Sequence, residues 1–228
     1  MLKAVLFDMD GVIVNTEPLH QKSYYQMFAD INIEVSEELY ASFTGQSTIA
    51  ISKILVDHFK LPMCPQTLVD LKRHHFKYLW ENDKDLNLLD GVLDIIKDYH
   101  NNGLTLVLAS SASMENINNI FERFHLNSYF VAKLSGADLK ASKPHPEIFE
   151  NAAVASGFER HECMVIEDST NGIKAAKDAG IFCVGYDSLH SNDQDYTLAD
   201  LVISDFKEIA YKTISEHFTS VVTKNKKL

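Results

Sequence analysis

The feature that most constrains the fold of this chain is a series of short apolar runs that alternate with helical patterns. Each run is bounded by Gly, Asp or Ser, which is typical of a fully buried strand. The runs are 4–7, 104–109, 130–134, 164–166, 182–185 and 201–203. From about residue 88 onward the strands alternate with helices, and this order predicts a parallel sheet covered on both faces. We therefore predict a doubly wound α/β core.

The stretch from residue 15 to about residue 87 breaks this alternation, because it contains amphipathic helical patterns with no strand-like run between them. Two apolar stripes at helical spacing give two helices a face to bury against each other. The stripes are Ile51, Ile54, Leu55 and Phe59, and Leu68, Leu71, Phe76, Leu79 and Trp80. We predict an all-helical domain at 15–87, inserted into a core made of 1–14 and 88–228.

Composition and charge exclude several classes of function. The 228 residues carry 21 Lys and Arg against 32 Asp and Glu, so a net charge of −11 should repel nucleic acids and anionic membranes. No apolar run approaches the roughly 20 residues of a membrane-spanning helix, and Asp8 interrupts the first run before a signal sequence could form. The three cysteines are far apart and suggest neither disulfides nor zinc. We expect a cytoplasmic protein that binds neither nucleic acid nor membrane.

The first candidate functional motif is Phe7-Asp8-Met9-Asp10-Gly11, where a buried strand gives way to a glycine turn. Ligands of open α/β sheets bind just beyond the carboxyl ends of the strands, so both carboxylates stand at the expected place. A polar turn without further function would use the same residues. An EF-hand calcium loop is excluded, because it needs an oxygen ligand at the fifth position, where Val12 stands, and a preceding helix.

Three further motifs lie at junctions between strands and helices. Glu167 and Asp168 follow one strand directly, although acids there could simply favour the start of the next helix. Ser110 and Ser111 end another strand, where backbone amides can bind an anion, although serines also cap helices. Lys143 stands in a segment with two prolines and restricted backbone freedom, although a single lysine is most often solvated surface.

All four motifs occupy the same kind of position in one sheet, the loop after a strand or before a core helix. Carboxylates gathered at one edge repel each other unless a cation neutralises them, and an all-oxygen cluster suits Mg²⁺. Lys143 and Ser110 would supply a positive charge and a hydrogen bond to an anion, which together describe a site for a phosphoryl group. The predicted metal ligands are Asp8, Asp10, Glu167 and Asp168.

In this order and spacing, the motifs resemble those of the haloacid dehalogenase superfamily of phosphohydrolases, in the subgroup with a helical cap. The closer resemblance, to β-phosphoglucomutases and related sugar phosphatases, is carried by 8–20, 108–111, 142–144 and 167–169. It spans essentially the whole chain. The resemblance implies a Rossmann-like core, with 15–87 as a cap that closes on hinges near 14–17 and 85–90. It also implies a monomer that acts on a small phosphorylated metabolite.

The resemblance implies a role for each acid of the core. Asp8 would attack phosphorus and become an aspartyl phosphate, so that one difficult displacement becomes two easier ones. Asp10 would protonate the leaving alcohol and later help to deprotonate water, while its backbone carbonyl binds Mg²⁺. Glu167 and Asp168 would complete the metal shell.

Other residues are implied to bind the substrate. Ser110 and the amide beyond it would hold the transferring oxygens, and Lys143 would offset the charge that the nucleophile and phosphate share. The remaining residues expected at the substrate are Gly11, His20, Gly45, Gln46, Ser47, Thr48, His74 and Ser111. Of these, His20 matches the family histidine that couples cap closure to the general acid.

The cap residues favour a phosphatase over a mutase. A mutase must hold a second phosphate with cationic groups, but Thr48 stands where the mutases carry an arginine and His74 where they carry a lysine. A neutral hydroxyl and a mostly neutral imidazole pair weakly with phosphate. We predict a Mg²⁺-dependent phosphatase of a small phosphorylated metabolite, with a sugar phosphate as the expected substrate. The alternatives are a β-phosphoglucomutase and a non-catalytic module that binds phosphorylated ligands or a protein partner.

Overall fold

The computed structural model of the chain divides into two compact units. The core unit comprises Met1–Asn15 and Asn87–Leu228, and the helical unit comprises Thr16–Leu86. The structure describes all residues except 44–47, 140, 189–193 and 226–228. The bounds of the helical unit differ by one residue at each end from the 15–87 predicted for the inserted domain. The action of this domain as a cap stays a prediction.

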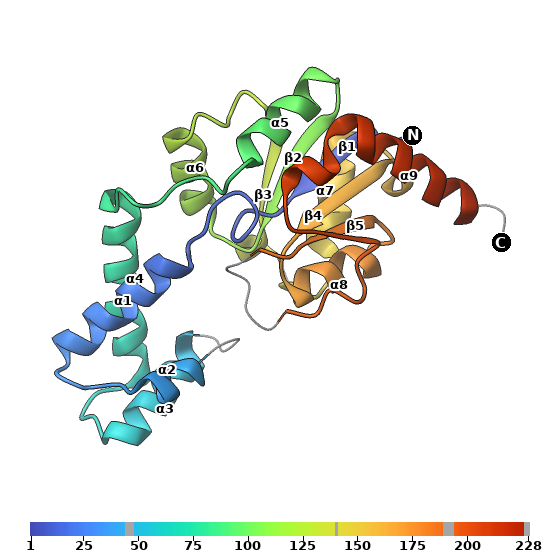
Figure 1. Cartoon of the computed structure of the whole chain (residues 1–228). Coiled ribbons are helices and arrows are strands. Elements are labelled where there is room, and N and C mark those ends of the chain that lie inside the picture. The colour runs from blue at the N-terminus through green and yellow to red at the C-terminus, as the bar shows by residue number, and fades with distance from the viewer. Residues whose placement is uncertain (44–47, 140, 189–193, 226–228) are drawn as a thin grey trace. The chain divides into compact units, whose positions relative to one another are not determined.

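The core unit is built on a six-stranded parallel sheet with the strand order β3-β2-β1-β4-β5-β6 (Figure 1). The strands are β1 (Ala4–Phe7), β2 (Thr105–Ser110), β3 (Phe130–Ser135), β4 (Cys163–Glu167), β5 (Phe182–Tyr186) and β6 (Leu201–Ile203). Each predicted strand is present, with ends within one residue of those expected. The strand order reverses between β1 and β4, which is where Rossmann-like sheets bind their ligands. The predicted doubly wound α/β core is therefore confirmed.

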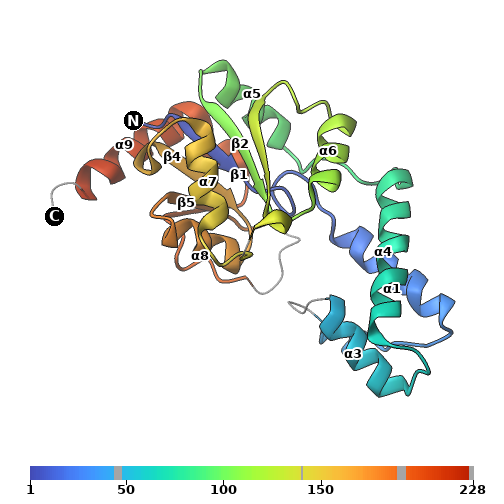
Figure 2. The same cartoon turned by 180° about the vertical axis from the view of Figure 1, so that it is seen from behind.

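Helices cover both faces of this sheet. Figure 1 shows α5 (Val92–Asn101) and α9 (Tyr211–Asn225) on one face, and Figure 2 shows α7 (Glu147–Ser156) and α8 (Thr170–Asp178) on the other. The remaining helix of this unit, α6 (Met114–Arg123), connects β2 to β3. Among the described residues of the connections are the short 3₁₀ helices η1 (Gly136–Asp138), η2 (Arg160–Glu162) and η3 (Phe206–Ile209).

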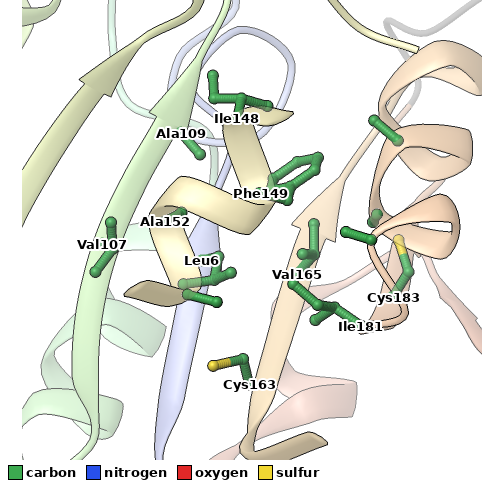
Figure 3. Close-up of a cluster of buried hydrophobic side chains, with 14 of the residues drawn as sticks. Leu6, Val107, Ala109, Ile148, Phe149, Ala152, Cys163, Val165, Ile181 and Cys183 are labelled. Carbon is green, nitrogen blue, oxygen red and sulfur yellow. The ribbon is translucent and has the colours of Figure 1, made fainter. Parts of the chain in front are cut away.

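A hydrophobic cluster fixes α7 over the centre of the sheet (Figure 3). Phe149 of α7 is fully buried in the same cluster as Leu6 of β1, Val107 of β2 and Val165 of β4. Burying each large apolar side chain contributes about 1.5–3 kcal/mol, so this contact stabilises the three central strands together. The ends of these strands, where the candidate site residues begin, are thereby held in a fixed register.

All regular structure among the described residues of the second unit is helical, as predicted. The helices are α1 (Glu17–Asp30), α2 (Glu37–Ala41), α3 (Thr48–Phe59) and α4 (Pro65–Asn82). Ile51 and Leu55 of α3 are buried with Leu68 of α4 and with Met27 and Phe28 of α1, so the predicted stripes do meet in one core. Across the described part of the chain, every helix is too short or too polar to span a lipid bilayer.

Candidate active site

Asp8 lies at the carboxyl end of β1, between β2 and β4, where the strand order reverses. It follows the last residue of β1, and its backbone N–H donates to the carbonyl of Ile166 in β4 at 3.0 Å. The chain then closes a tight turn, in which Gly11 donates to the Val14 carbonyl at 2.8 Å and adopts a φ of 83°. Glycine tolerates this positive φ at little cost. The turn keeps Asp10 near the same strand end as Asp8.

Lys143 connects the ends of the three central strands. Its ammonium forms ion pairs with Asp8 Oδ1 and, at 2.8 Å, with Glu167 Oε1. It also donates to the carbonyl of Ala109 at 3.1 Å. The exposed fractions of the Lys143, Asp8 and Glu167 side chains are only 7%, 8% and 1%. Burial by itself would lower the pKa of Lys143, but the two carboxylates outweigh it and raise the pKa, so this lysine is charged.

The pKa of Asp8 is raised well above its ordinary value. Burial is the largest cause, and the ammonium of Lys143 opposes it. Three further carboxylates add to the rise, those of Glu167, Asp168 and Asp10. The acids around Asp8 thus outnumber the ammonium that pairs with it, and such an excess of buried negative charge fits a divalent cation.

Glu167 and Asp168 are adjacent in sequence but have different surroundings. Both oxygens of Glu167 are engaged, since Oε1 binds Lys143 and Oε2 accepts from the amide and hydroxyl of Ser169 at 2.7 and 2.9 Å. Asp168 instead lies against the turn after β1, because a Cβ added to Gly11 would come within 2.0 Å of Asp168 Oδ2. Asp168 is therefore close to the turn, while Glu167 orients Lys143.

The residues fit a Mg²⁺ ion held by two carboxylates. Within the residues that the structure describes, no three His, Cys, Asp or Glu side chains form a metal-binding group. Mg²⁺ commonly uses one or two carboxylates and completes its shell with water and substrate oxygens. Asp8 and Asp168 can supply these two carboxylates beside the Asp10 turn. Oε1 of Glu167 accepts only the bond from Lys143 and keeps a second lone pair, so direct ligation by Glu167 stays a prediction.

The predicted phosphate-binding loop begins where β2 ends. Ser110 is fully buried, and its Oγ accepts a hydrogen bond from the Ala112 amide at 3.1 Å, whereas Ser111 is exposed. The loop leads into α6, where the Ser113 hydroxyl caps the amide of Asn116. Pairing between β1 and β2, together with the bond from Lys143 to Ala109, brings this loop to the edge that carries Asp8. Backbone amides before a helix favour binding of an anion.

The helical unit contains a second buried lysine. Lys72 Nζ lies 2.6 Å from His20 Nδ1, and 4.5 and 5.3 Å from the ring centroids of Phe76 and Tyr24. Burial lowers the pKa of Lys72 to about 8, although the charge of Glu17 acts in the opposite direction. Burial and the charge of Lys72 together lower the pKa of His20 to about 3. A neutral His20 therefore accepts a hydrogen bond from the Lys72 ammonium.

Lys72, which the sequence prediction passed over in favour of His74, is the cationic residue that faces His20. His74 is exposed on α4, with its ring 5.8 Å from that of His75. The helical spacing of Leu68, Lys72 and Phe76 was the signal that could have placed Lys72 on the buried face.

The remaining residues predicted for the helical unit lie in or before α3. Thr48 opens α3 and accepts a hydrogen bond at its carbonyl from Ser52 at 2.8 Å. Gly45, Gln46 and Ser47 lie outside the described residues. The substrate roles of these residues stay predictions.

Comparison with known proteins decides the family. A sequence model of the haloacid dehalogenase-like hydrolases matches residues 5–186 of this chain. The chain belongs to the haloacid dehalogenase-like hydrolase family. This result confirms the resemblance seen in the sequence motifs and identifies the chain as an enzyme.

Two relatives and one solved structure illustrate which members of this family the chain is similar to. Hexitol phosphatase B of Escherichia coli (strain K12) is 26% identical over 215 residues, covering 92% of this chain and 96% of that protein. The β-phosphoglucomutase of Bacillus subtilis (strain 168) is 28% identical over 222 residues, covering 95% and 96%. The crystal structure of CbbY from Rhodobacter sphaeroides in complex with phosphate has a TM-score of 0.76 at 25% identity, covering 92% and 96%. The similarity therefore extends over both units of this haloacid dehalogenase-like enzyme.

Proposed function

We propose that the chain is a Mg²⁺-dependent phosphatase that hydrolyses a small phosphorylated metabolite, a sugar phosphate, with Asp8 as the nucleophile. The observation that carries the proposal is the buried ion pair of Lys143 with Asp8 and Glu167, beside Asp10 and Asp168. The names of the two relatives, a hexitol phosphatase and a β-phosphoglucomutase, support a phosphorylated sugar or sugar alcohol as the substrate.

In the first step, a carboxylate oxygen of Asp8 attacks phosphorus, and the bond from phosphorus to the leaving alcohol breaks. Asp10 donates a proton to that alcohol. The product is an aspartyl phosphate at Asp8, and the charge that the carboxylate and phosphate share during the attack is stabilised by the Lys143 ammonium. The Ser110 hydroxyl and the Ser111 amide donate hydrogen bonds to the transferring oxygens.

In the second step, water attacks the phosphorus of the aspartyl phosphate and releases inorganic phosphate. Asp10 accepts the proton of this water, so the acid of the first step is the base of the second. The carboxylates of Asp8 and Asp168 and the backbone carbonyl of Asp10 would hold Mg²⁺. When bound, this ion neutralises charge that gathers on the carboxylates and phosphate.

The helical unit supports a phosphatase over a mutase. A mutase needs a cation that can bind the second phosphate of its intermediate. Lys72 has only 4% of its surface exposed, and its ammonium is held by His20 and two aromatic rings. By the resemblance, Thr48 and the exposed His74 are expected at the positions of the mutases' arginine and lysine, where they would bind a second phosphate weakly.

The test of the proposal is hydrolysis of 4-nitrophenyl phosphate with Mg²⁺. Asp8→Asn should lower kcat by about 10³-fold or more, because the amide is a poor nucleophile. Asp178→Asn is the matched control, because Asp178 is exposed and pairs only with Lys174 within α8 as far as its described ion pairs go. Equal activity in Asp8→Asn and wild type would contradict the proposal, and so would full activity after complete removal of divalent metal.

A second assay separates a phosphatase from a mutase. The enzyme is given β-glucose 1-phosphate together with a bisphosphate primer, and both products are followed. Free phosphate should form faster than glucose 6-phosphate. The opposite order would favour the mutase.

A further inference from the structure

The geometry points to Ser135, at the end of β3, as a positioning residue for phosphate binding by the Ser110 loop. The inference rests on the proposed function, since it assumes that this loop binds the phosphoryl group. Ser135 is only 5% exposed, and it stands directly beside Ser110 in the pairing of β3 with β2. Its Oγ donates a hydrogen bond to the carbonyl of Ala112 at 2.8 Å.

The Ala112 residue is held on both sides by these two serines. Its amide donates to Ser110 Oγ at 3.1 Å, and its carbonyl accepts from Ser135 Oγ. A hydroxyl has one proton to donate and two lone pairs. Because Ser110 accepts from Ala112 with a lone pair, its proton stays available for a phosphoryl oxygen. Ser135 therefore controls the direction of the Ser110 hydroxyl through the Ala112 residue that lies between them.

Close packing after β3 supports the same role. A Cβ added to Gly136 would lie 3.1 Å from Ser111 Cα and 3.3 Å from the Ser110 carbonyl oxygen. The backbone that follows Ser135 therefore rests directly against the backbone of the Ser110 loop. Contacts this tight leave the loop little freedom to rotate its amides away from the bound anion.

The sheet topology explains why β3 can act on the loop. β3 is an outer strand of the sheet and pairs with β2, whose last residue is Ser110. Ser135 thus contacts the loop from the side opposite β1, which carries Asp8. It touches neither Asp8 nor Lys143 in the hydrogen bonds of the structure, so its effect should fall on phosphate binding more than on the chemical step.

Ser156 provides a matched control. It is a serine with 8% of its surface exposed, and its Oγ donates to the Ala153 carbonyl at 2.7 Å. Ser156 ends α7 and lies 3.7 Å from the sulfur of Cys163, the first residue of β4, at the edge of the sheet opposite Asp8. Ser135→Ala and Ser156→Ala therefore each remove a buried hydroxyl that donates to a backbone carbonyl, at opposite ends of the same core, although Ser156 also accepts from the Phe158 amide.

The experiment measures binding of inorganic phosphate by isothermal titration calorimetry with Mg²⁺, and kcat and KM for 4-nitrophenyl phosphate. Ser135→Ala should raise the phosphate Kd and the KM by about tenfold, with a smaller change in kcat, because small errors of position weaken an oriented site. Ser156→Ala should leave both constants within about twofold of wild type. In a Ser110→Ala background, Ser135→Ala should raise the phosphate Kd and the KM much less than it does in the wild type, since the two residues would act on one loop.

Equal phosphate Kd values for Ser135→Ala, Ser156→Ala and wild type would overturn the inference alone. A wild-type enzyme that neither binds phosphate nor hydrolyses the aryl phosphate would overturn the proposed function and this inference with it. If Ser135→Ala does not fold, Ser135→Cys tests the same contact, because a thiol fills the space of the hydroxyl but is a weak hydrogen-bond donor to the Ala112 carbonyl. A wild-type phosphate Kd in a folded Ser135→Cys variant would also contradict the inference.

Discussion

Lys143 in the core unit and Lys72 in the helical unit are both buried, but their partners differ in charge. Lys143 in the core unit forms ion pairs with two carboxylates, which raise its pKa despite burial. Lys72 in the helical unit faces a neutral histidine and two aromatic rings, and burial lowers its pKa to about 8. The first lysine is therefore held in its charged form, while the second loses its proton as the pH rises through about 8.

The different partners predict different contributions of the two lysines to the stability of the fold. A buried charge is expensive unless an opposite charge compensates it. The carboxylates of Asp8 and Glu167 compensate Lys143, and the remaining acids there leave negative charge for a cation. The aromatic rings and His20 compensate Lys72 only in part. We infer that Lys143 is structurally necessary to the site, whereas Lys72 lowers the stability of its own unit.

Replacing each lysine with methionine should give effects of opposite sign. Lys143→Met leaves two buried carboxylates without their partner and should lower the free energy of unfolding of the core unit by about 3–5 kcal/mol. Lys72→Met keeps the apolar stem and removes a poorly compensated charge, so it should stabilise the helical unit by about 1 kcal/mol or more. Urea denaturation checks both effects, with circular dichroism for the whole chain and fluorescence of Trp80, the only tryptophan, for the helical unit.

A larger loss of stability in Lys72→Met than in Lys143→Met would contradict this comparison of the two lysines.

The double variant Lys143→Met/Asp8→Asn tests whether the ion pair is the cause of the stability loss. Removing the carboxylate that lost its partner should recover part of the stability lost in Lys143→Met alone, and no recovery would mean that the ion pair is not the cause.

The pH dependence of stability offers a smaller test. The pKa of Lys72 is about 8 in the folded chain and 10.5 ordinarily, so the unfolded chain binds more protons between these values. Stability of the helical unit should therefore rise as the pH increases from about 8 towards 10.5, with the full cost of the charge present below 8. The measurement is urea denaturation followed by Trp80 fluorescence across this range, in wild type and Lys72→Met. The difference between the two curves should shrink with rising pH, and a constant difference would contradict the lowered pKa.

The end of β1 could be predicted from sequence because its signals are local. A short apolar run followed by Asp8, Asp10 and Gly11 identifies both a strand and its end. The location of the site then follows, because parallel strands bring their carboxyl ends together and ligands bind just beyond these ends. Lys143 was harder to place, since its partners Asp8 and Glu167 lie 135 and 24 residues away along the chain.

Lys72 and Ser135 show why the remaining contacts could not be predicted. A lysine in a helix normally signals an exposed face, but Lys72 is buried, and one of its partners, His20, lies 52 residues away along the chain. Ser135 looks like an ordinary polar end of a strand, and its contact with Ala112 depends on which strand β3 pairs with. Helical spacing could have placed Lys72 on the buried face of its helix, but the partner residues of both contacts are set by tertiary packing, which local patterns do not encode.

The most direct test of the central claim is a search for the phosphoryl group on Asp8. The Asp10→Ala variant is mixed with 4-nitrophenyl phosphate and Mg²⁺, because this leaving group needs no proton donor while hydrolysis of the phosphoenzyme still needs a base. A rapid burst of about one nitrophenolate per enzyme molecule should appear, and acid quenching followed by peptide mass spectrometry should find phosphate on Asp8. A phosphoryl group on any other residue, or slow release without a burst or phosphoenzyme, would contradict the account.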